Sequence, residues 1–325
     1  MTATSMQALV FEVSGKAEEV LGVKILPIPE PVAGEVLVRV EARPIQPADM
    51  MFIGGRYRIK PSFPQVAGLE GSGTVVSVGD GVSLPAGTRV AFRHPGTWAE
   101  YVCVPVAKVH VVPGDVTAEK ACQFSLNPLT AWALLDEAAL QPGDWIAVNA
   151  ASSGIARLVH GLATRKGARV VGIIRGALKH PLPFPAVSTD SADLAAEILA
   201  KTAGQNIAAL LDSVGGSSIT RVFPAMKQGA TIVSYGVMDA TAAQVGNADM
   251  IYRNLKWKGF GIDYWLSQLG EPTDQVAAQI WQALADGQLD LPVRGKFPLS
   301  EFRGALEAAA AGPNTGKVLL EGLPA

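Results

Sequence analysis

Apolar and polar residues alternate in an early segment of the chain. Between residues 35 and 41, three valines fall on one face, and a leucine, an arginine and a glutamate fall on the other. This period of two predicts a β-strand with one buried face and one partly solvated face. Further short runs, rich in β-branched and aromatic residues and separated by glycine and proline turns, lie at residues 73–78, 88–93 and 98–104. The N-terminal part of the chain is therefore expected to be mostly β.

The pattern changes near residue 115. Helices are expected at residues 118–126 and 127–140, and Pro128 would occupy a tolerated position in the first turn of the second helix. Short apolar runs then alternate with helical segments, which predicts a parallel, doubly wound sheet. The expected strands cover residues 145–148, 169–174, a short run around Val187, 208–211, 231–235 and 255–260, and the expected helices start near Ser153 or cover 193–201 and 273–285.

The last part of the chain is expected to rejoin the first domain, with a helix at residues 299–311 and a strand at 316–320. A length of 325 residues, of which 49% are hydrophobic, suits two domains. The fold class is therefore α/β. The expected division gives a β domain from residues 1–120 and 288–325 and a parallel-sheet domain from residues 121–287.

The turn between the strand at 145–148 and the following helix has the features of a nucleotide-binding turn. Dinucleotide folds place G-x-G-x-x-G at this point, whereas here the small residues are Ala150, Ser153 and Ala156, with Gly154 between them. The first amides of a helix lack partners and carry the positive end of its dipole, so they can hold a phosphate. The Ser153 hydroxyl adds a further donor. An ordinary crossover with a tight turn remains the alternative.

The end of the next strand favours NADP over NAD. NAD-binding enzymes place an acidic residue near this point, whereas an arginine accommodates the extra phosphate of NADP. No acidic residue occurs from residue 168 to 180, and Arg175, Lys179 and His180 could surround a phosphate. The predicted cofactor is therefore NADPH. A solvated arginine at a strand end is the alternative interpretation.

Composition excludes several classes of protein. The net charge is -2 and the cations are scattered, so we expect no nucleic-acid partner. No apolar run approaches the ~20 residues of a membrane helix. The N-terminus lacks the features of a targeting signal, so a cytoplasmic location is expected. Cys103 and Cys122 are the only cysteines, and we expect them to be buried thiols.

Short glycine-containing motifs recur along the chain in a fixed order. They are Ile45-Gln-Pro-Ala-Asp49, Gly68-Leu-Glu-Gly71 with Gly73-x-Val75-x-x-x-Gly79, Gly96-Thr-Trp-Ala-Glu-Tyr101, Pro142-Gly-Asp144 and Asp212-Ser-Val-Gly-Gly216. In this order and spacing, over nearly the whole length, the chain resembles the medium-chain dehydrogenase/reductase superfamily. The resemblance implies a GroES-like β domain and a Rossmann domain.

One residue separates the chain from the zinc-dependent members of that superfamily. They carry Gly-His-Glu and a four-cysteine lobe, whereas this chain has Leu69 in place of that histidine and lacks the lobe. Leucine cannot bind a metal ion, and the four histidines show no ligand spacing. We therefore expect no metal site. Reduction of an activated double bond or of a quinone is then favoured over alcohol dehydrogenation.

Three segments are similar to the NADPH-dependent 2-enoyl thioester reductases. These are Asn127-Pro-Leu-Thr-Ala-Trp132, Asn149-Ala-Ala-Ser-Ser-Gly154 and the arginine-terminated strand that ends at Arg175. The resemblance implies Tyr57 and Asn127 as catalytic residues, although quinone reductases often have a tyrosine at the first position too. It also implies cofactor contacts at Gln46, Ser152, Ser153, Gly154, Ile155, Arg175, Lys179, Ser213, Val214, Tyr235, Gly236, Phe260 and Lys317.

The chemistry of an enoyl thioester gives Tyr57 its expected role. Hydride must reach the β carbon while negative charge grows on the carbonyl oxygen. A tyrosine hydroxyl has a reference pKa of about 10 and stays protonated at neutral pH, so it can donate to that oxygen or supply the α proton. Asn127 could hold the nicotinamide or a water, or could simply cap a helix.

Several alternatives remain open at this point. A quinone reductase of the same fold is the second hypothesis, and a non-catalytic nucleotide-binding protein is the third. The pair Tyr252 and Lys256 matches the Tyr-x-x-x-Lys motif of short-chain reductases, but we assign it to the lead-in of an edge strand. By resemblance that strand is expected to pair across a homodimer. Prolines at 181, 183 and 185 forbid the helix that the family usually has after Arg175.

Overall fold

The computed structural model describes residues 4–269, 273–311 and 315–322 of the chain. These residues form two compact units. The first unit combines Met1–Leu126 with Leu291–Ala325, and the second is Asn127–Asp290.

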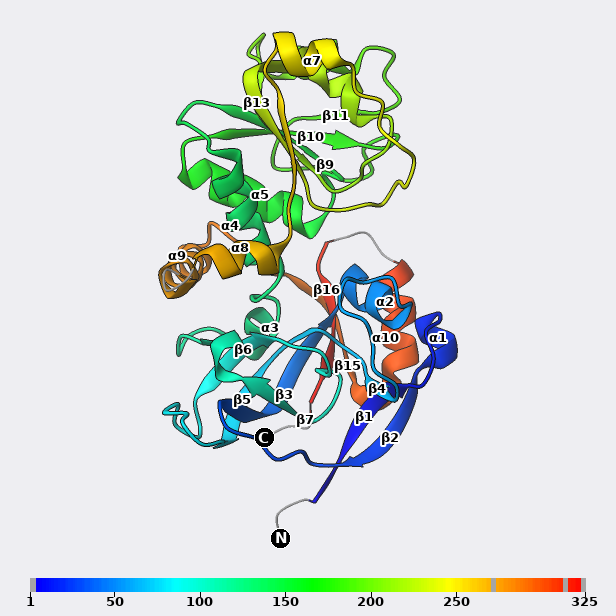
Figure 1. Ribbon diagram of the computed structural model, residues 1–325, viewed down its shortest axis with the longest axis vertical. Coiled ribbons are helices and arrows are strands. Elements are labelled where there is room, and N and C mark those ends of the chain that lie inside the picture. The colour runs from blue at the N-terminus through cyan, green and yellow to red at the C-terminus, as the bar shows by residue number, and fades with distance from the viewer. Residues whose placement is uncertain (1–3, 270–272, 312–314, 323–325) are drawn as a thin grey trace. The chain divides into compact units, whose positions relative to one another are not determined.

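The first unit is mostly β, as predicted. A small sheet contains β1 (Ser5–Phe11), β2 (Gly22–Pro27) and β4 (Gln65–Val66), and a larger one contains β3 (Glu35–Ile45), β5 (Glu70–Val78), β6 (Arg89–Arg93), β7 (Tyr101–Pro105), β8 (Val109–Val111), β15 (Val293–Pro298) and β16 (Lys317–Glu321). The strand order of the larger sheet is β15-β16-β3-β5-β6-β8, and β7 also pairs with β3. Figure 1 shows the late strand β16, in red, beside the early strand β3, in blue. The last residues of the chain therefore complete the first domain, as the sequence predicted.

Short helices connect or cover these strands. They are α1 (Ala17–Val20), α2 (Pro47–Ile53), α3 (Ala118–Ala121) and α10 (Phe302–Ala311), with the 3-10 turns η1 (Val106–Lys108) and η3 (Leu299–Glu301). Strand β3 is more buried than its alternation suggested, since Leu37 is only 8% exposed. On the same strand, Ala42 packs against Cys122 and Leu319. The prediction of a partly solvated second face therefore holds for Arg39 and Glu41, which are half-buried, and is wrong for Leu37.

The expected helix at residues 118–126 is also much shorter. Helix α3 ends at Ala121, and the backbone amides of Gln123 and Phe124 bond to the carbonyl groups of Lys120 and Ala121 in successive turns. The Gln123 side chain then donates to the Leu291 carbonyl at 3.1 Å. The chain uses this segment to tie the β sheet to the returning C-terminal part, and a continuous helix would not allow these bonds.

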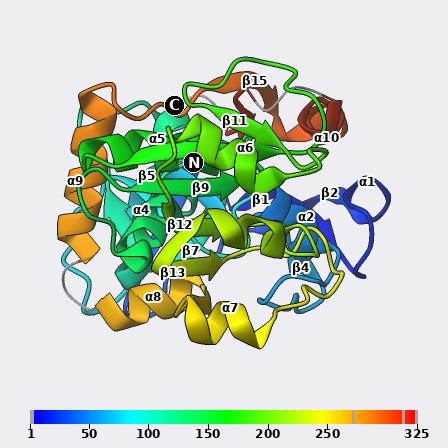
Figure 2. The ribbon, with the colours of Figure 1, turned by 90° about the horizontal axis from the view of Figure 1, so that it is seen from above.

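The second unit is the predicted parallel sheet. Its strands are β9 (Trp145–Asn149), β10 (Arg169–Ile174), β11 (Ala186–Ser188), β12 (Ile207–Asp212), β13 (Met226–Ser234) and β14 (Lys256–Gly259). Their order is β11-β10-β9-β12-β13-β14, and each neighbouring pair is parallel. Figure 2 shows β9, β12 and β13 side by side in this sheet. With β9 as the first strand this is the 3-2-1-4-5-6 order of a Rossmann fold.

Helices surround this sheet. They are α4 (Asn127–Ala138), α5 (Gly154–Arg165), α6 (Leu194–Lys201), α7 (Asn247–Tyr252), α8 (Ile262–Leu269) and α9 (Thr273–Ala285), with the 3-10 segment η2 (Ile219–Ala225). The sequence predicted α4, α5, α6 and α9, but it missed α7, α8 and, in the first unit, α2. The buried strands carry the core, since every residue of β12 is buried.

No helix forms between β10 and β11, as the prolines predicted. Phe184, between Pro183 and Pro185, is 7% exposed, and its ring centroid lies 5.1 Å from that of His160 on α5. A Cβ added to Gly172 on β10 would lie 2.9 Å from the Phe184 ring. The ring therefore packs directly on the sheet where the family's helix is missing.

Candidate active site

The turn between β9 and α5 has the geometry of a phosphate-binding turn. Ser153 caps α5, because its hydroxyl oxygen accepts a hydrogen bond from the Ala156 amide at 3.2 Å. The next amides inside the helix, those of Gly154 and Ile155, belong to the first turn and have no intrahelical acceptor. These two residues are half-buried and Ser152 is exposed. The turn thus leaves amides for an anion at the positive end of a helix of 12 residues.

The turn approaches the sheet closely. Ala151 is fully buried, and its amide donates to the Ile173 carbonyl of β10 at 3.2 Å. A Cβ on Gly172 would lie 2.6 Å from the Ala151 side chain, so only glycine fits at that position of β10. Ala150 has a φ of 46°, in the left-handed region where glycine is the usual residue. The turn therefore keeps its close approach to the sheet although alanine and serine replace glycines of the G-x-G-x-x-G motif, and its backbone is strained at Ala150.

A buried polar network joins the carboxyl ends of three neighbouring strands. Asn149 ends β9 and donates to the Asp212 carboxylate, which ends β12. The other side of the Asn149 amide accepts from the Ser213 backbone amide at 2.7 Å. Asp212 also accepts from the Gly215 amide at 2.8 Å and from the Ser234 hydroxyl of β13 at 2.9 Å. Two of the predicted cofactor residues, Ser213 and Val214, are therefore held in a fixed turn at the strand ends.

Tyr235 and Gly236 lie directly against that turn. The Tyr235 amide donates to the Asp212 carbonyl at 2.8 Å. A Cβ on Gly236 would lie 2.3 Å from the Ser213 carbonyl oxygen, so glycine permits this approach. Burial raises the pKa of the Tyr235 hydroxyl to about 12, which keeps it a proton donor. These predicted residues thus gather at the edge where open parallel sheets bind their ligands.

The predicted phosphate residues lie in the segment between β10 and β11. Arg175, Lys179 and His180 are all exposed. Gly176 has a φ of 69°, and a Cβ there would lie 3.9 Å from the Asp190 carboxylate, so the loop turns back toward the end of β11. Arg175 is therefore available to an anion at the strand end.

Three aromatic residues after β14 and in α8 differ in their exposure. Phe260 is half-buried at the end of β14, where its amide donates to the Ser234 carbonyl at 2.8 Å. Trp265 is 6% exposed, and its indole donates to Asp136 at 3.3 Å. Tyr264 is 72% exposed. Trp265 is therefore a core residue, and of these three aromatic side chains only Phe260 and Tyr264 are accessible.

The first unit contains a buried polar cluster around Glu70. Gln46 donates to the Glu70 carboxylate from its side-chain amide at 2.8 Å, and the Leu126 backbone amide donates to the other oxygen at 2.7 Å. The Gln46 backbone amide also donates to Asp49 at 3.0 Å in a capping box at the start of α2. Half-buried Lys317 lies near both carboxyl groups. The structure thus brings together Gln46 and Lys317, two predicted cofactor residues, around Glu70.

Burial governs protonation in this cluster. Loss of water raises the pKa of Asp49 to about 8 and that of Glu70 to about 7. Burial also lowers the pKa of Lys317, although the nearby Glu70 and Asp49 oppose the shift. The cluster therefore contains groups that change charge close to neutral pH.

Tyr57 follows α2 and is half-buried against the core that contains Phe52. Its amide donates to the Met51 carbonyl at 3.0 Å, so the backbone is fixed by the helix end. The guanidinium of Arg58 lies 5.6 Å from the centre of the Tyr57 ring. The Tyr57 ring is thus packed against the core of the first unit, and the Arg58 guanidinium lies near it.

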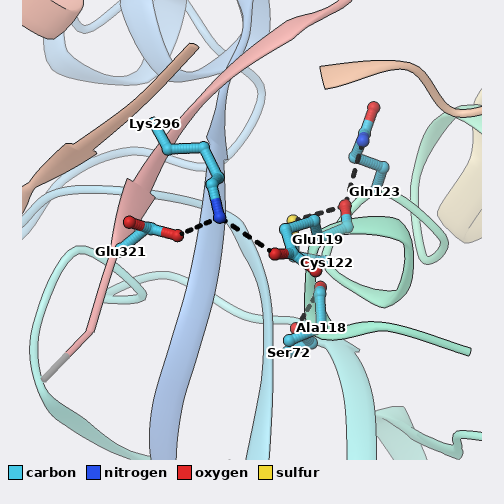
Figure 3. A network of polar contacts seen from close by, with 7 residues as sticks. All are labelled: Ser72, Ala118, Glu119, Cys122, Gln123, Lys296 and Glu321. Carbon is cyan, nitrogen blue, oxygen red and sulfur yellow. Dashed lines mark hydrogen bonds and ion pairs between the residues drawn. The ribbon is translucent and has the colours of Figure 1, made fainter. Parts of the chain in front are cut away.

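Asn127 is the first residue of α4 and is half-buried. The segment before it is tied to the β sheet (Figure 3), since the Ser72 hydroxyl donates to the Ala118 carbonyl at 2.8 Å and Lys296 bridges Glu119 and Glu321 at 3.1 and 2.9 Å. At the end of this segment, the Leu126 backbone amide donates to the Glu70 carboxylate. The peptide that enters Asn127 is therefore anchored, which the sequence did not reveal.

Sequence reasoning missed Glu70, Asp212 and Gly172 as residues that support the predicted sites. Glu70 and Asp212 lay inside the quoted motifs, but their hydrogen-bond partners are distant in sequence. An acidic residue directly after a buried apolar strand was the available signal for Asp212. Nothing local distinguished Gly172, because its requirement comes from the approach of Ala151.

Within the described residues, no group of three or more His, Cys, Asp or Glu side chains could hold a metal ion. Leu69 is 2% exposed and packs in the hydrophobic core of the first unit. The side chains at the position of the family's zinc ligand therefore do not fit a metal. Among all the residues that the structure describes, no helix has the length and apolar character of a membrane span.

Parts of the chain match known protein families, and nearly the whole chain is similar to a known protein. Residues 32–114 match the family described as alcohol dehydrogenase GroES-like domain, and residues 185–320 match the family described as zinc-binding dehydrogenase. The chain is 30% identical to a mitochondrial enoyl-[acyl-carrier-protein] reductase of Xenopus tropicalis, over 94% of this chain and 92% of that protein.

Solved structures have the same fold over the whole chain. A Bacillus thuringiensis protein, provisionally named an NADPH:quinone reductase, has a TM-score of 0.88 and 25% identity, and the match covers 98% of this chain and 99% of that one. A mycobacterial protein solved with NADPH has a TM-score of 0.83 and 26% identity, with 97% and 99% of the two chains covered.

Proposed function

The chain belongs to the medium-chain dehydrogenase/reductase superfamily, and we propose that it reduces the activated double bond of a 2-enoyl thioester with NADPH. The protein is an oxidoreductase, so the non-catalytic alternative no longer stands. The observation that carries the choice of substrate is the chain-long similarity to an enoyl reductase together with the Asn127–Trp132 segment at the start of α4.

The residues of the second unit suit the phosphates of a dinucleotide. The amides of Gly154 and Ile155 and the hydroxyl of Ser152 are offered at the start of α5, and Arg175 follows β10. Arg175 supports NADPH rather than NADH, because a guanidinium binds a phosphate with two parallel hydrogen bonds. When bound, NADPH would supply the hydride. The other proposed cofactor residues of this unit are Ser213, Val214, Tyr235, Gly236, Phe260 and, in the loop after Arg175, Lys179.

The residues of the first unit suit the proton side of the reaction. In our proposal Tyr57 donates a hydrogen bond or a proton to the developing enolate, and Asn127, the first residue of the second unit, orients the carboxamide or a water. Gln46 and Lys317 would hold the cofactor from their positions around Glu70. We propose that this chemistry runs without zinc, since Leu69 stands at the ligand position and is buried.

Quinone reduction is the second candidate. It is favoured by the Bacillus thuringiensis structure, whose TM-score of 0.88 is high over 98% of this chain. A quinone needs hydride and a proton donor but no thioester site, so Tyr57 and the nucleotide site would serve either substrate. The two candidates are separated by substrate tests and not by the cofactor.

We also propose a homodimer formed through β14. This strand lies at an edge of its sheet within the described residues. Two large side chains shortly before it in sequence are well exposed, namely Ile251 at 69% and Tyr252 at 79%. Exposed apolar side chains next to an unpaired strand edge are compatible with an interface. Sedimentation at micromolar concentration tests this, and a monomer would contradict it. A cytoplasmic location stays a prediction, and the Xenopus relative is named mitochondrial.

Activity assays test the proposed reaction. NADPH oxidation is followed with crotonyl-CoA and, separately, with a simple quinone. Turnover of the thioester supports the proposal, whereas quinone turnover alone replaces it with the second candidate. Under either reaction Tyr57→Phe should lower kcat with little change in the Kd of NADPH. Equal rates for the variant and the wild type would remove Tyr57 from the chemistry.

A further inference from the structure

The segment around Tyr57 carries a local positive charge that the proposed chemistry does not use. Residues 50–69 contain Arg56, Arg58 and Lys60 but no aspartate or glutamate, although the chain as a whole has a net charge of -2. Such a concentration of one sign raises the local potential and attracts anions. The cations lie one residue before, one after and three after Tyr57.

The backbone sorts this segment into a packed side and a charged side. Tyr57 and Ile59 are half-buried and pack against the core of the first unit, whereas Arg56, Arg58 and Lys60 are exposed. The Arg56 amide donates to the Met51 carbonyl at 2.8 Å, which fixes the start of the segment to the end of α2. The three cations are therefore presented to solvent from a backbone that is itself held in place.

Two of these cations, Arg56 and Lys60, have no ion pair among the described residues. The Arg56 side chain makes no hydrogen bond among the described residues, and the Lys60 ammonium donates only to the Gly55 carbonyl, at 3.0 Å. Both side chains are exposed and can therefore pair with an external anion, and charge-assisted hydrogen bonds from arginine or lysine to a phosphate are among the stronger ones.

We propose that Arg56 and Lys60 bind a phosphate of the carrier to which the enoyl group is attached. This inference rests on the proposed thioester reduction, because a quinone has no phosphate. Thioester substrates end in pantetheine that is phosphorylated, either in coenzyme A or on a carrier protein, so both sources share this chemistry. An arginine and a lysine beside the proposed proton donor would hold the phosphate end while the thioester reaches Tyr57.

Arg58 is left out of this role for a geometric reason. Its guanidinium lies over the Tyr57 ring at 5.6 Å, so a change there would disturb the proposed proton donor. Arg56 and Lys60 can be changed with less effect on that ring. Glutamine removes each charge and keeps a polar side chain of similar length.

The experiment compares three substrates that share the crotonyl-pantetheine group and differ in what is attached to its end, which is nothing, a phosphate or the nucleotide of coenzyme A. KM is measured for crotonyl-pantetheine, crotonyl-phosphopantetheine and crotonyl-CoA with the wild type and the double variant Arg56→Gln/Lys60→Gln. For the wild type we expect a lower KM for the phosphorylated substrates. In the double variant that advantage should fall by about tenfold, which corresponds to about 1.4 kcal/mol, and it should fall likewise in the wild type at high salt.

Matched controls use two exposed lysines outside the segment. The double variant Lys108→Gln/Lys120→Gln removes the same charge from the first unit, and it should keep the full advantage of the phosphorylated substrates. If the Arg56/Lys60 variant keeps that advantage too, the proposal is overturned. A comparable loss in both double variants also overturns it, because net charge alone would then explain the effect.

The three substrates also identify the source of the phosphate. An effect already complete with crotonyl-phosphopantetheine assigns the cations to the phosphate common to both carriers. An effect that appears only with crotonyl-CoA assigns them to the nucleotide part of coenzyme A. If the wild type reduces none of the three thioesters but reduces a quinone, the proposed function has failed. Thioester reduction with no phosphate preference overturns the phosphate site alone.

Discussion

The carboxylate of Glu70 accepts a hydrogen bond from the backbone amide of Leu126, 56 residues further along the chain, at 2.7 Å. The other oxygen accepts from Gln46 at 2.8 Å. One buried side chain therefore connects a predicted cofactor residue with the peptide that leads into Asn127. Zinc-dependent relatives have a metal ligand directly before this glutamate, whereas here Leu69 is part of the core.

Replacement of Glu70 by glutamine should therefore destabilise the first unit. Glutamine keeps one acceptor oxygen but turns a donor group toward Leu126 or Gln46, and a buried unsatisfied donor costs roughly 1–3 kcal/mol. Urea unfolding measures the loss. The control is Glu301→Gln, where the side chain is exposed and the change should be within about 0.5 kcal/mol. An unaltered unfolding free energy for Glu70→Gln would show that these bonds do not matter.

Stability should also depend on pH through Asp49 and Glu70. Their folded pKa values, about 8 and about 7, lie above the unfolded reference values. As pH rises, the unfolded state therefore loses these protons at a lower pH than the folded state does. The free energy of unfolding that these groups contribute is fully present below about pH 4 and is lost progressively up to about pH 8. We expect the free energy of unfolding to fall between pH 5 and pH 8.

Asp49→Asn isolates one of these groups. Asparagine cannot ionise, and its carbonyl oxygen can still accept from the Gln46 amide, so the variant should show a shallower fall between pH 5 and pH 8. Unfolding in urea across this range measures the slope. A slope equal to that of the wild type would contradict burial as the cause of the pKa shift of Asp49.

Ala150→Gly should stabilise the second unit. Ala150 has a φ of 46°, where an alanine is strained by about 1 kcal/mol relative to glycine. The substitution should raise the free energy of unfolding by up to that amount while the nucleotide turn keeps its shape. Ala151→Gly is the matched control. Ala151 is buried and has no left-handed φ, so glycine there should destabilise. Destabilisation by both changes would refute strain at Ala150.

Arg175→Ala tests the choice between the two nucleotides. Loss of a guanidinium that contacts the extra phosphate should raise the Kd of NADPH by roughly tenfold and leave the Kd of NADH nearly constant. Fluorescence titration with both nucleotides measures the two constants. Arg165→Ala, on the last turn of α5, is the control and should change neither. Equal effects of Arg175→Ala on both nucleotides would remove its proposed role.

Much of the parallel sheet could be predicted because its signal is local. Strands such as β9, β10 and β12 are buried on both faces and read as short apolar runs. Helix α5 was predicted to start near Ser153, and in the structure Ser153 caps it. The missed helices α2, α7 and α8 are short, at 7, 6 and 8 residues, and such lengths carry little periodic signal.

The contacts that support the candidate sites could not be predicted, because they join residues that are far apart in the sequence. Asn149 and Asp212 are 63 residues apart, and only the sheet order makes them neighbours. Phe184 looked like one apolar residue in a proline-rich loop, yet it covers the strand where a helix is missing. The alternation in β3 indicated a strand correctly, but burial of Leu37 depends on distant parts of the chain.

Transfer of deuterium from labelled NADPH to crotonyl-CoA tests the central claim most directly. The enzyme is supplied with NADPH that carries deuterium at the transferred position, and the thioester product is analysed by mass spectrometry and NMR. The account predicts butyryl-CoA with one deuterium on the β carbon, formed in step with NADPH oxidation. Unchanged crotonyl-CoA, or a saturated product without deuterium at that carbon, would contradict reduction of the enoyl double bond by hydride transfer.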